Sequence, residues 1–201
     1  MTASPSSDPM SSAAAGRRLI EPADLGRFRS VVDVALDRSA RTVVATIGWP
    51  DVDTDANRSV LEACDVDGGG RRRLTEGHRD RQPRFSPDGH RLAFLRGQPG
   101  EPTRVAVADW PTMVVTEVAS LRDGAADVQW IGDDGLVVVG PRRPPDQEGV
   151  DDSELARRPR ILTRTDYRFN GRGWTNDRLG QVLVIDEIVE GAELRAIGRS
   201  E

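Results

Sequence analysis

Hydrophobic residues recur along this chain in short runs, and Gly, Pro, Asp and Asn separate one run from the next. The clearest example is residues 84–95, where Phe85 precedes the turn Ser86-Pro87-Asp88-Gly89 and the alternating residues Leu92 and Phe94 follow it. Proline presets φ, aspartate can bond its own backbone, and glycine accepts a positive φ without steric cost. The pattern therefore predicts a strand, a tight turn and a second strand.

Weaker copies of this hairpin occur before and after it in the chain. The turns that follow the first strands begin at Asp37, Ser86 and Gly132, which are 49 and 46 residues apart. Later strands end at Asp65, Asp109 and Asp186, which are 44 and 77 residues apart, so an insertion interrupts the third copy. Four short strands repeated at this period are typical of β-propeller blades, which bury their faces by stacking around an axis.

The repeat predicts an all-β fold, a partial β-propeller of about three four-stranded blades. The blades cover about residues 30–76, 82–120 and 125–198, and the third contains an insertion at residues 140–178. The fourth strand of the first blade is predicted at 71–75. An antiparallel β-sandwich has similar short strands, but it does not require Phe85 and Trp130 to return in phase. Residues 1–18 are mostly Ser, Ala, Pro and Asp and predict a disordered tail, so the incomplete propeller covers residues 19–201.

Charge and cysteine content exclude several classes of partner. The chain has 28 basic residues, all arginine, against 33 acidic ones, and a net charge of −5 argues against non-specific nucleic-acid binding. Its single cysteine, Cys64, rules out an internal disulfide and fits a reducing compartment. No apolar run approaches the ~20 residues of a membrane helix, and no secretory signal pattern is visible. We therefore expect a cytoplasmic protein that binds neither nucleic acid nor membranes.

Two stretches resemble a known family. Pro22-Ala23-Asp24-Leu25, followed by the apolar run 32–36, resembles the entry into the propeller of prolyl-oligopeptidase-family (S9) serine peptidases of the acylaminoacyl-peptidase and dipeptidyl-aminopeptidase branch. Here residues 37–40, Asp-Arg-Ser-Ala, replace the Ser-Pro-Asp-Gly turn of that family. Residues 163–177 are similar to its third-blade insertion, and residues 85–94 also resemble TolB-type and WD40-like blades. The resemblance covers the chain from about residue 19 to its end.

The resemblance implies that hydrolysis belongs to a C-terminal α/β-hydrolase domain with a Ser–Asp–His triad. This sequence contains no Gly-x-Ser-x-Gly elbow, and we expect neither catalytic residues nor a cofactor in it. The chain would be the non-catalytic propeller portion of a peptidase, gating the access of short peptides to that missing domain. It would then be a fragment, a truncated gene product or one half of a split gene. The alternative is a stand-alone TolB/WD40-like module that binds other proteins.

The candidate functional residues lie in the insertion, where aromatic side chains, guanidinium groups and glycines occur together. They are predicted to face the substrate or the hydrolase domain: Tyr167, Arg168, Asn170, Arg172 and Trp174. Arg168 or Arg172 would pair with a substrate carboxylate or with the partner domain, because guanidinium binds carboxylates in a bidentate way. An extended hairpin that only packs on its own blade explains the same residues, and the sequence leaves both interpretations open.

Two other motifs are interpreted as structural. Asp51 to Glu62 has oxygen side chains at the spacing of an EF-hand loop, but Ala56 stands where the sharp turn needs glycine, and strands flank the loop. We therefore expect no metal site there. Ser86 lies in a turn with His90 on its far side, and a serine nucleophile requires a base within hydrogen-bond reach. We therefore interpret Ser86 as a turn residue.

Overall fold

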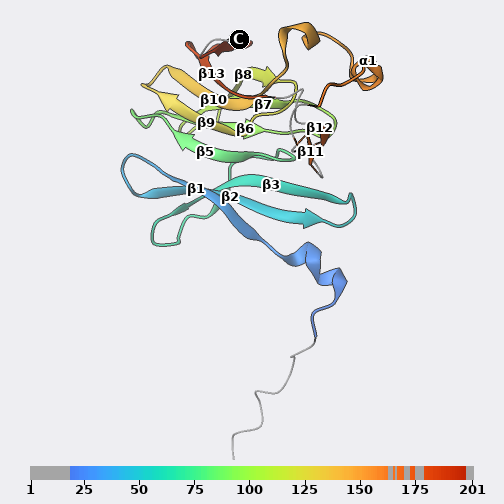
Figure 1. Cartoon of the computed structure of the whole chain (residues 1–201). Helices are drawn as coiled ribbons and strands as arrows, with labels where there is room; N and C mark the ends of the chain where they lie inside the picture. The colour runs from blue at the N-terminus through green and yellow to red at the C-terminus, as the bar shows by residue number, and fades with distance from the viewer. Residues whose placement is uncertain (1–18, 163–164, 166, 170–172, 175–178, 198–201) are drawn as a thin grey trace, which may run out of the picture.

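A computed structural model describes residues 19–162, 165, 167–169, 173–174 and 179–197. Three four-stranded antiparallel sheets stack against one another in chain order, with the first at the bottom of the view in Figure 1. This arrangement confirms the predicted all-β fold and the partial propeller of three blades. The predicted tail, residues 1–18, lies outside the described residues.

Sheet 1 has the strand order β1-β2-β3-β4, in which every strand pairs with its neighbour in sequence. A 3-10 helix, η1 (Pro22–Arg27), precedes it, and the backbone N–H of Glu21 donates to the Asp24 carboxylate at the start of this helix. The outer strand contains only two residues, because Leu74 already packs into the core beside it. The strands are β1 (Ser30–Leu36), β2 (Thr42–Asp51), β3 (Ala56–Asp65) and β4 (Arg72–Arg73).

Sheet 2 contains the hairpin that best displays the repeat, and its strand order is β5-β6-β7-β8. Gly89 has a φ of 80°, as the Ser-Pro-Asp-Gly turn requires, and the Ser86 amide donates to the Arg91 carbonyl at 2.9 Å. The strands are β5 (Arg81–Phe85), β6 (Arg91–Arg96), β7 (Thr103–Asp109) and β8 (Val115–Leu121).

Sheet 3 has the order β14-β13-β10-β9, with a long connection between its second and third strands. β10 and β13 pair as far as Arg142 and Leu179, so the connection comprises residues 143–178. The strands are β9 (Asp127–Ile131), β10 (Gly135–Arg142), β13 (Leu179–Ile185) and β14 (Arg195–Ala196). The connection holds η2 (Pro145–Gln147), α1 (Asp152–Arg157) and a small hairpin of β11 (Arg168–Phe169) and β12 (Gly173–Trp174).

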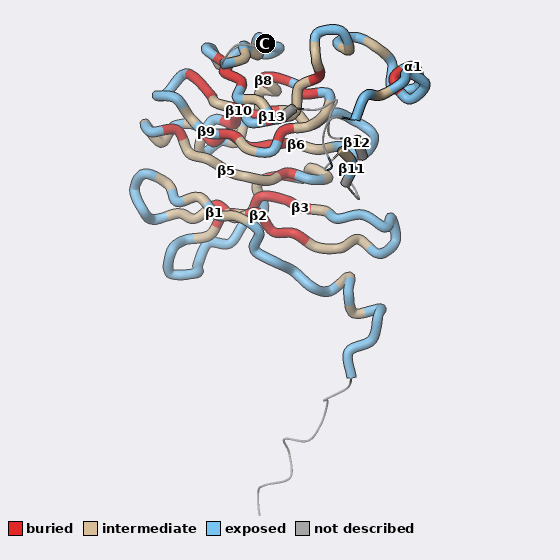
Figure 2. Tube along the Cα trace, viewed as in Figure 1, coloured by how far each residue is buried: buried red, intermediate tan, exposed pale blue. Residues whose placement is uncertain are grey.

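Sheet 2 is buried on both faces, because alternate residues of its strands point to opposite sides. Leu92, Phe94, Ala106 and Ala108 pack toward sheet 1 against Val44, Leu61 and Ala63. Ala93, Leu95, Val105 and Val107 pack toward sheet 3 against Val128, Leu136, Val138, Leu183 and Ile185. The buried segments of Figure 2 follow these two layers. The stacking thus removes from water the near-continuous apolar runs that the sequence places in β6 and β7.

Polar contacts join the innermost strands of the three sheets. Arg84 on β5 lies 2.7 Å from the Asp33 carboxylate on β1 and 3.7 Å from that of Asp127 on β9. The indole N–H of Trp130 donates to the Arg84 carbonyl at 2.8 Å. One side chain in the middle sheet therefore links all three.

The tight turns at one end of the strands are also in contact. The Arg38 guanidinium donates to the Pro87 carbonyl at 2.9 Å, and the Asp88 amide donates to the Asp133 carboxylate at 2.8 Å. Arg91 then pairs with Asp134 at 2.7 Å. These bonds fix the sheets in register with one another.

Candidate functional site

The connection between β10 and β13 contains the residues that the sequence nominates for function. Its small hairpin aligns Arg168 with Trp174 and Phe169 with Gly173 across β11 and β12. The rings of Tyr167 and Trp174 are stacked, with centroids 5.7 Å apart and planes inclined by 30°. Two of the five nominated residues, Asn170 and Arg172, lie outside the described residues. The structure thus brings together the three that it describes.

Two guanidinium groups lie over the Trp174 ring. The Cζ of Arg168 is 5.7 Å from the ring centroid, and the Cζ of Arg160 is 4.5 Å from it. Each such cation–π contact is worth about 0.5–1 kcal/mol at an exposed site. Arg160 was missed by the sequence analysis because it lies seven residues before Tyr167, outside the resembling stretch. Its alternation with aromatic residues, not its position in a motif, was the available signal.

This aromatic–arginine cluster, defined as Arg160, Tyr167, Arg168 and Trp174, combines a flat apolar surface with positive charge. Arg168 is exposed, whereas Tyr167 and Trp174 are half-buried. A guanidinium whose face rests on an aromatic ring can still direct its N–H groups outward in its own plane, and those groups match a carboxylate. The cluster is therefore chemically suited to bind a carboxylate that is attached to an apolar or aromatic group.

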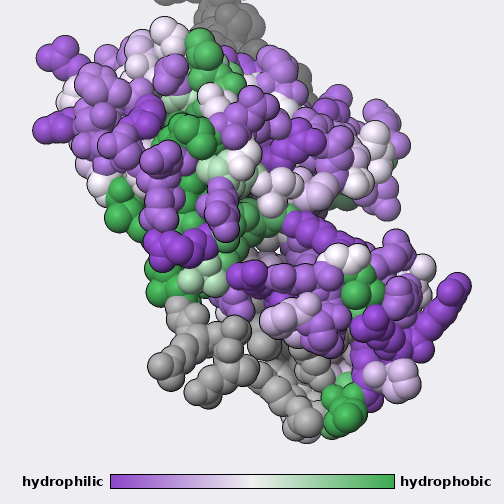
Figure 3. Space-filling model, turned by 90° about the horizontal axis from the view of Figure 1, so that it is seen from above, coloured by the Kyte–Doolittle hydropathy of each residue, from purple (hydrophilic) through white to green (hydrophobic). Residues whose placement is uncertain are grey.

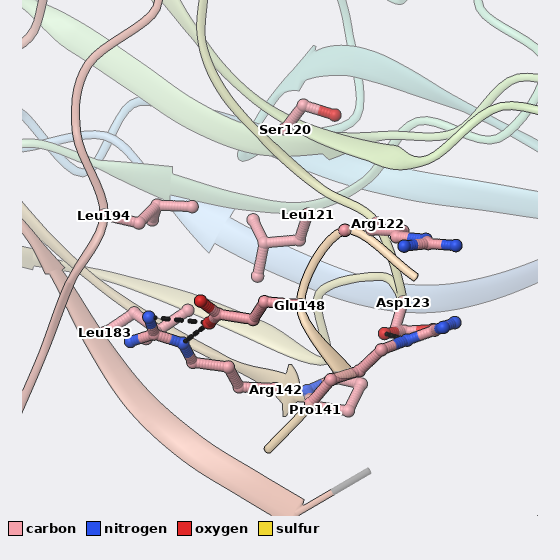
Figure 4. A pocket seen from close by; sticks show the side chains of 11 residues that line it. Ser120, Leu121, Arg122, Asp123, Pro141, Arg142, Glu148, Leu183 and Leu194 are labelled. Carbon is pink, nitrogen blue, oxygen red and sulfur yellow. Dashed lines mark hydrogen bonds and ion pairs between the residues drawn. The ribbon is translucent and has the colours of Figure 1, made fainter. Parts of the chain in front are cut away.

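A cleft of about 280 Å³ opens at the base of the connection, where it leaves sheet 3. Leu121, Leu183 and Leu194 form its apolar wall, and Figure 4 shows Arg142 turned toward Glu148 at its edge. Arg142 and Glu148 are 2.8 Å apart and both are solvent-accessible. The cleft lies between the end of β8 and the end of β10, so its walls come from sheets 2 and 3.

Arg143 is the best-buried charge in this cleft. Its Nε and Nη2 each donate to Asp123 at 2.8 Å, and its Nη1 lies 2.7 Å from the Asp152 carboxylate at the start of α1. The Arg143 and Asp123 side chains are only 5% and 6% exposed. The hydrogen bonds from Asp123, and then those from Asp152, raise the pKa of Arg143 above its usual value despite burial. Arg143 is therefore a permanent cation that ties the connection to the turn after β8.

The other charged side chains of the cleft are engaged in the same way. Arg122 donates to the Val150 carbonyl at 2.9 Å and to Asp152 at 3.4 Å. Asp151 caps α1 by accepting from the Ser153 amide at 2.7 Å, and its bonds with the Ser153 side chain and amide lower the pKa of this aspartate. Because each of its arginines has a carboxylate partner, the cleft serves chiefly as an ionic anchor for the connection.

The structure also places the two motifs that were interpreted as structural. Ser86 is 2% exposed, and its hydroxyl donates to Asp88 at 2.5 Å and accepts the Arg91 amide at 2.9 Å. Ser86 is thus a turn residue. Asp51 at the end of β2 accepts the Asp53 amide at 3.2 Å and pairs with Arg58 at 3.1 Å. Chiefly because of Arg58, the pKa of Asp51 is below its ordinary value. In the part of the chain that is described, the helices are too short and polar to cross a membrane.

Comparison with known proteins identifies the fold through solved structures alone. No protein-family model matches the sequence, and no curated protein matches it significantly. An acylaminoacyl peptidase from Pyrococcus horikoshii is similar over 88% of this chain and 26% of its own, with a TM-score of 0.67 and 19% identity. The AtxE2 isopeptidase is similar over 83% of this chain and 29% of its own, with a TM-score of 0.58 and 21% identity.

A third similar structure is an isolated propeller. The β-propeller domain of the Trilobed protease from Pyrococcus furiosus, described as having an open velcro topology, matches 86% of this chain and 44% of its own. The TM-score is 0.53 and the identity is 15%. The chain thus spans about a quarter of the two peptidases and less than half of this propeller. The shared property is the propeller fold.

Proposed function

We propose that this chain is the non-catalytic propeller portion of an S9-family serine peptidase, which gates the access of short peptides to an α/β-hydrolase domain. The observation that carries the proposal is the structural similarity to an acylaminoacyl peptidase over 88% of this chain, with three consecutive sheets in the same fold. The departure from the plain repeat is a connection in the third sheet, where the sequence resembles the insertion of that family.

The aromatic–arginine cluster would supply the contact with the peptide. Arg168 is exposed and rests on Trp174, so its N–H groups are available to a carboxylate, while Tyr167 and Trp174 offer rings to an apolar side chain. A peptide with a free C-terminus combines these two features. Carboxylates of the hydrolase domain would compete for the same guanidinium groups.

The catalytic part of the proposal is tested with the purified chain. Its serine in the best-formed turn is buried and hydrogen-bonded, so we expect no hydrolysis of aminoacyl-nitroanilides. Cleavage that a serine-directed inhibitor abolishes would contradict this. A second test is the DNA downstream: a continuation that encodes further blades and a Gly-x-Ser-x-Gly elbow supports the peptidase, whereas a true stop before an unrelated gene favours the protein-binding module.

Peptide recognition is tested by following the indole N–H signals of the four tryptophans by NMR during titration with a short hydrophobic peptide. We expect the Trp174 signal to shift with the free-acid peptide and much less with its C-terminal amide, because only the former pairs with Arg168. Trp174→Ala should abolish binding. Trp49→Ala is the matched control, since Trp49 has its own cation–π contact with Arg29, at 4.9 Å on sheet 1. Equal shifts with both peptides, or none, would contradict carboxylate recognition.

A further inference from the structure

The two end sheets of the stack each present an apolar face that the described part of the chain leaves largely uncovered. On sheet 1 this face comprises Val31, Val34, Leu36 and Val43, and the first three are 65%, 55% and 53% exposed. On sheet 3 it comprises Ile131, Val137, Val139, Val182 and Val184, with Ile131, Val139 and Val182 being 46%, 37% and 40% exposed. We call them the sheet-1 and sheet-3 outer faces. Figure 3 shows a hydrophobic band, framed by hydrophilic residues, on the upper side of the stack.

Strand register shows what kind of surface each outer face is. In sheet 2, Phe85 lies opposite Leu92 and Leu92 opposite Ala108, and these residues pack onto the preceding sheet. In sheet 1, Leu36 lies opposite Val43 and Val43 opposite Cys64, in the same positions after the turn. The sheet-1 outer face is therefore the equivalent of a face that the chain buries elsewhere.

The sheet-3 outer face has the complementary equivalence. Val137 lies opposite Val184, and Val139 opposite Val182, on β10 and β13. The corresponding positions of sheet 2 are Ala93 opposite Val107 and Leu95 opposite Val105, which pack onto the following sheet and are at most 3% exposed. One chain thus contains, at its two ends, both halves of the junction that it forms twice internally.

The charges at the turns are complementary as well. Within the chain the tight turns of successive sheets touch, as Arg38 does with Pro87. By the same stacking, the turn of sheet 3, with the exposed Asp133 and Asp134, would meet the turn of a following sheet. The turn of sheet 1 carries Arg38 and the exposed Arg41. A second copy would thus place arginines beside the acidic turn of sheet 3.

We infer that two copies of this chain associate reciprocally, with the sheet-1 outer face of each packed on the sheet-3 outer face of the other. Two copies of three sheets make a six-sheet ring, within the range of four to eight blades in propellers. Every residue pair then occurs twice, as two-fold symmetry requires, and the ring leaves no outer face exposed. Association through these faces needs neither a peptide nor a hydrolase domain, so its test is independent of the proposed function.

The experiment measures the mass of the purified full chain by light scattering after size-exclusion chromatography, over a range of concentrations. We expect twice the chain mass of 22.0 kDa. Val34→Asp and Val139→Asp each place a charge in an apolar junction, and each should weaken dimerisation by at least about a hundredfold. Val114→Asp is the matched control, because Val114 is 63% exposed in the turn before β8 and belongs to neither face. Circular dichroism verifies that all variants stay folded.

Mixing the two variants gives a sharper readout. In a mixed pair of Val34→Asp and Val139→Asp, one junction has two native faces and the other contains both aspartates. We therefore expect the mixture to form dimers that neither variant forms alone. A wild-type monomer at all concentrations would overturn the inference and favour further sheets on another polypeptide as the occupant. Masses that rise without limit would overturn ring closure, and insensitivity to Val139→Asp would overturn the head-to-tail pairing.

Discussion

Replacing Asp123 by alanine tests whether the buried ion pair holds the β10–β13 connection in place. Arg143 would lose two hydrogen bonds of 2.8 Å at a position where both side chains are about 95% buried. Removing one partner of a buried pair typically costs about 3–5 kcal/mol, since the remaining charge is left uncompensated. Because Asp152 still lies 2.7 Å from Arg143, we expect the lower end of that range, about 3 kcal/mol.

The measurement is urea unfolding of the full chain, followed by circular dichroism. With a slope of about 2 kcal/mol/M, a loss of about 3 kcal/mol moves the midpoint down by about 1.5 M. The slope itself should not change, because the surface exposed on unfolding is nearly the same. Asp152→Ala is the matched control: its carboxylate is 68% exposed, so the loss should be less than about 1 kcal/mol.

A double variant identifies the origin of the effect. Asp123→Ala combined with Arg143→Met removes both buried charges, so it should be more stable than Asp123→Ala alone. A loss below about 1 kcal/mol for Asp123→Ala would show that solvent screens the pair and would refute the reasoning. A double variant that is less stable than the single one would show that packing, rather than the uncompensated charge, dominates.

Two further predictions concern single sites in sheets 2 and 3. Gly140→Ala should destabilise the protein by about 1–3 kcal/mol, because a Cβ there would lie 2.7 Å from Leu121 Cδ2, whereas Gly180→Ala, with open space around it, should be neutral or slightly stabilising in the same urea assay. The Ser86 hydroxyl, with the His90 amide, lowers the pKa of Asp88 below 3.8, so this contribution to stability is present at neutral pH and lost as the pH falls through the folded-state pKa. Ser86→Ala should raise the pKa of Asp88 toward 3.8 in a carboxyl NMR titration, and its stability deficit should shrink below about pH 4; an unchanged pKa would contradict the assignment.

Local chemistry made the sheets predictable from the sequence. The Ser86–Gly89 turn depends on neighbouring residues alone, and its hydrogen bonds close within six positions of the chain. The outer strand of sheet 1 was predicted at residues 71–75, but only Arg72 and Arg73 pair, because an edge strand has a single neighbour and Leu74 gains more by turning into the core. Its length was decided by packing, which the local pattern does not record.

The candidate site was predictable only in part. Tyr167, Arg168 and Trp174 stand close together in the sequence, and the hairpin needs only short-range pairing to unite them. Arg160 reaches the same ring from outside the motif. The Arg143–Asp123 pair joins residues 20 positions apart on different sheets, and nothing in the spacing of an arginine-rich, aspartate-rich chain distinguishes it from the many exposed pairs.

The position of Arg84 on β5 has a consequence for how the stack opens. Repeats that contact only their neighbours can fray from the ends one unit at a time, with each junction opening independently. Here one guanidinium touches Asp33 on one side and Asp127 on the other, so opening either junction removes a counter-charge from the group that serves the second. The outer sheets, which share no core cluster, are thereby energetically coupled across sheet 2. Amide-exchange protection should then fall together in β2 and β10, as in a single cooperative unit, rather than first at one end.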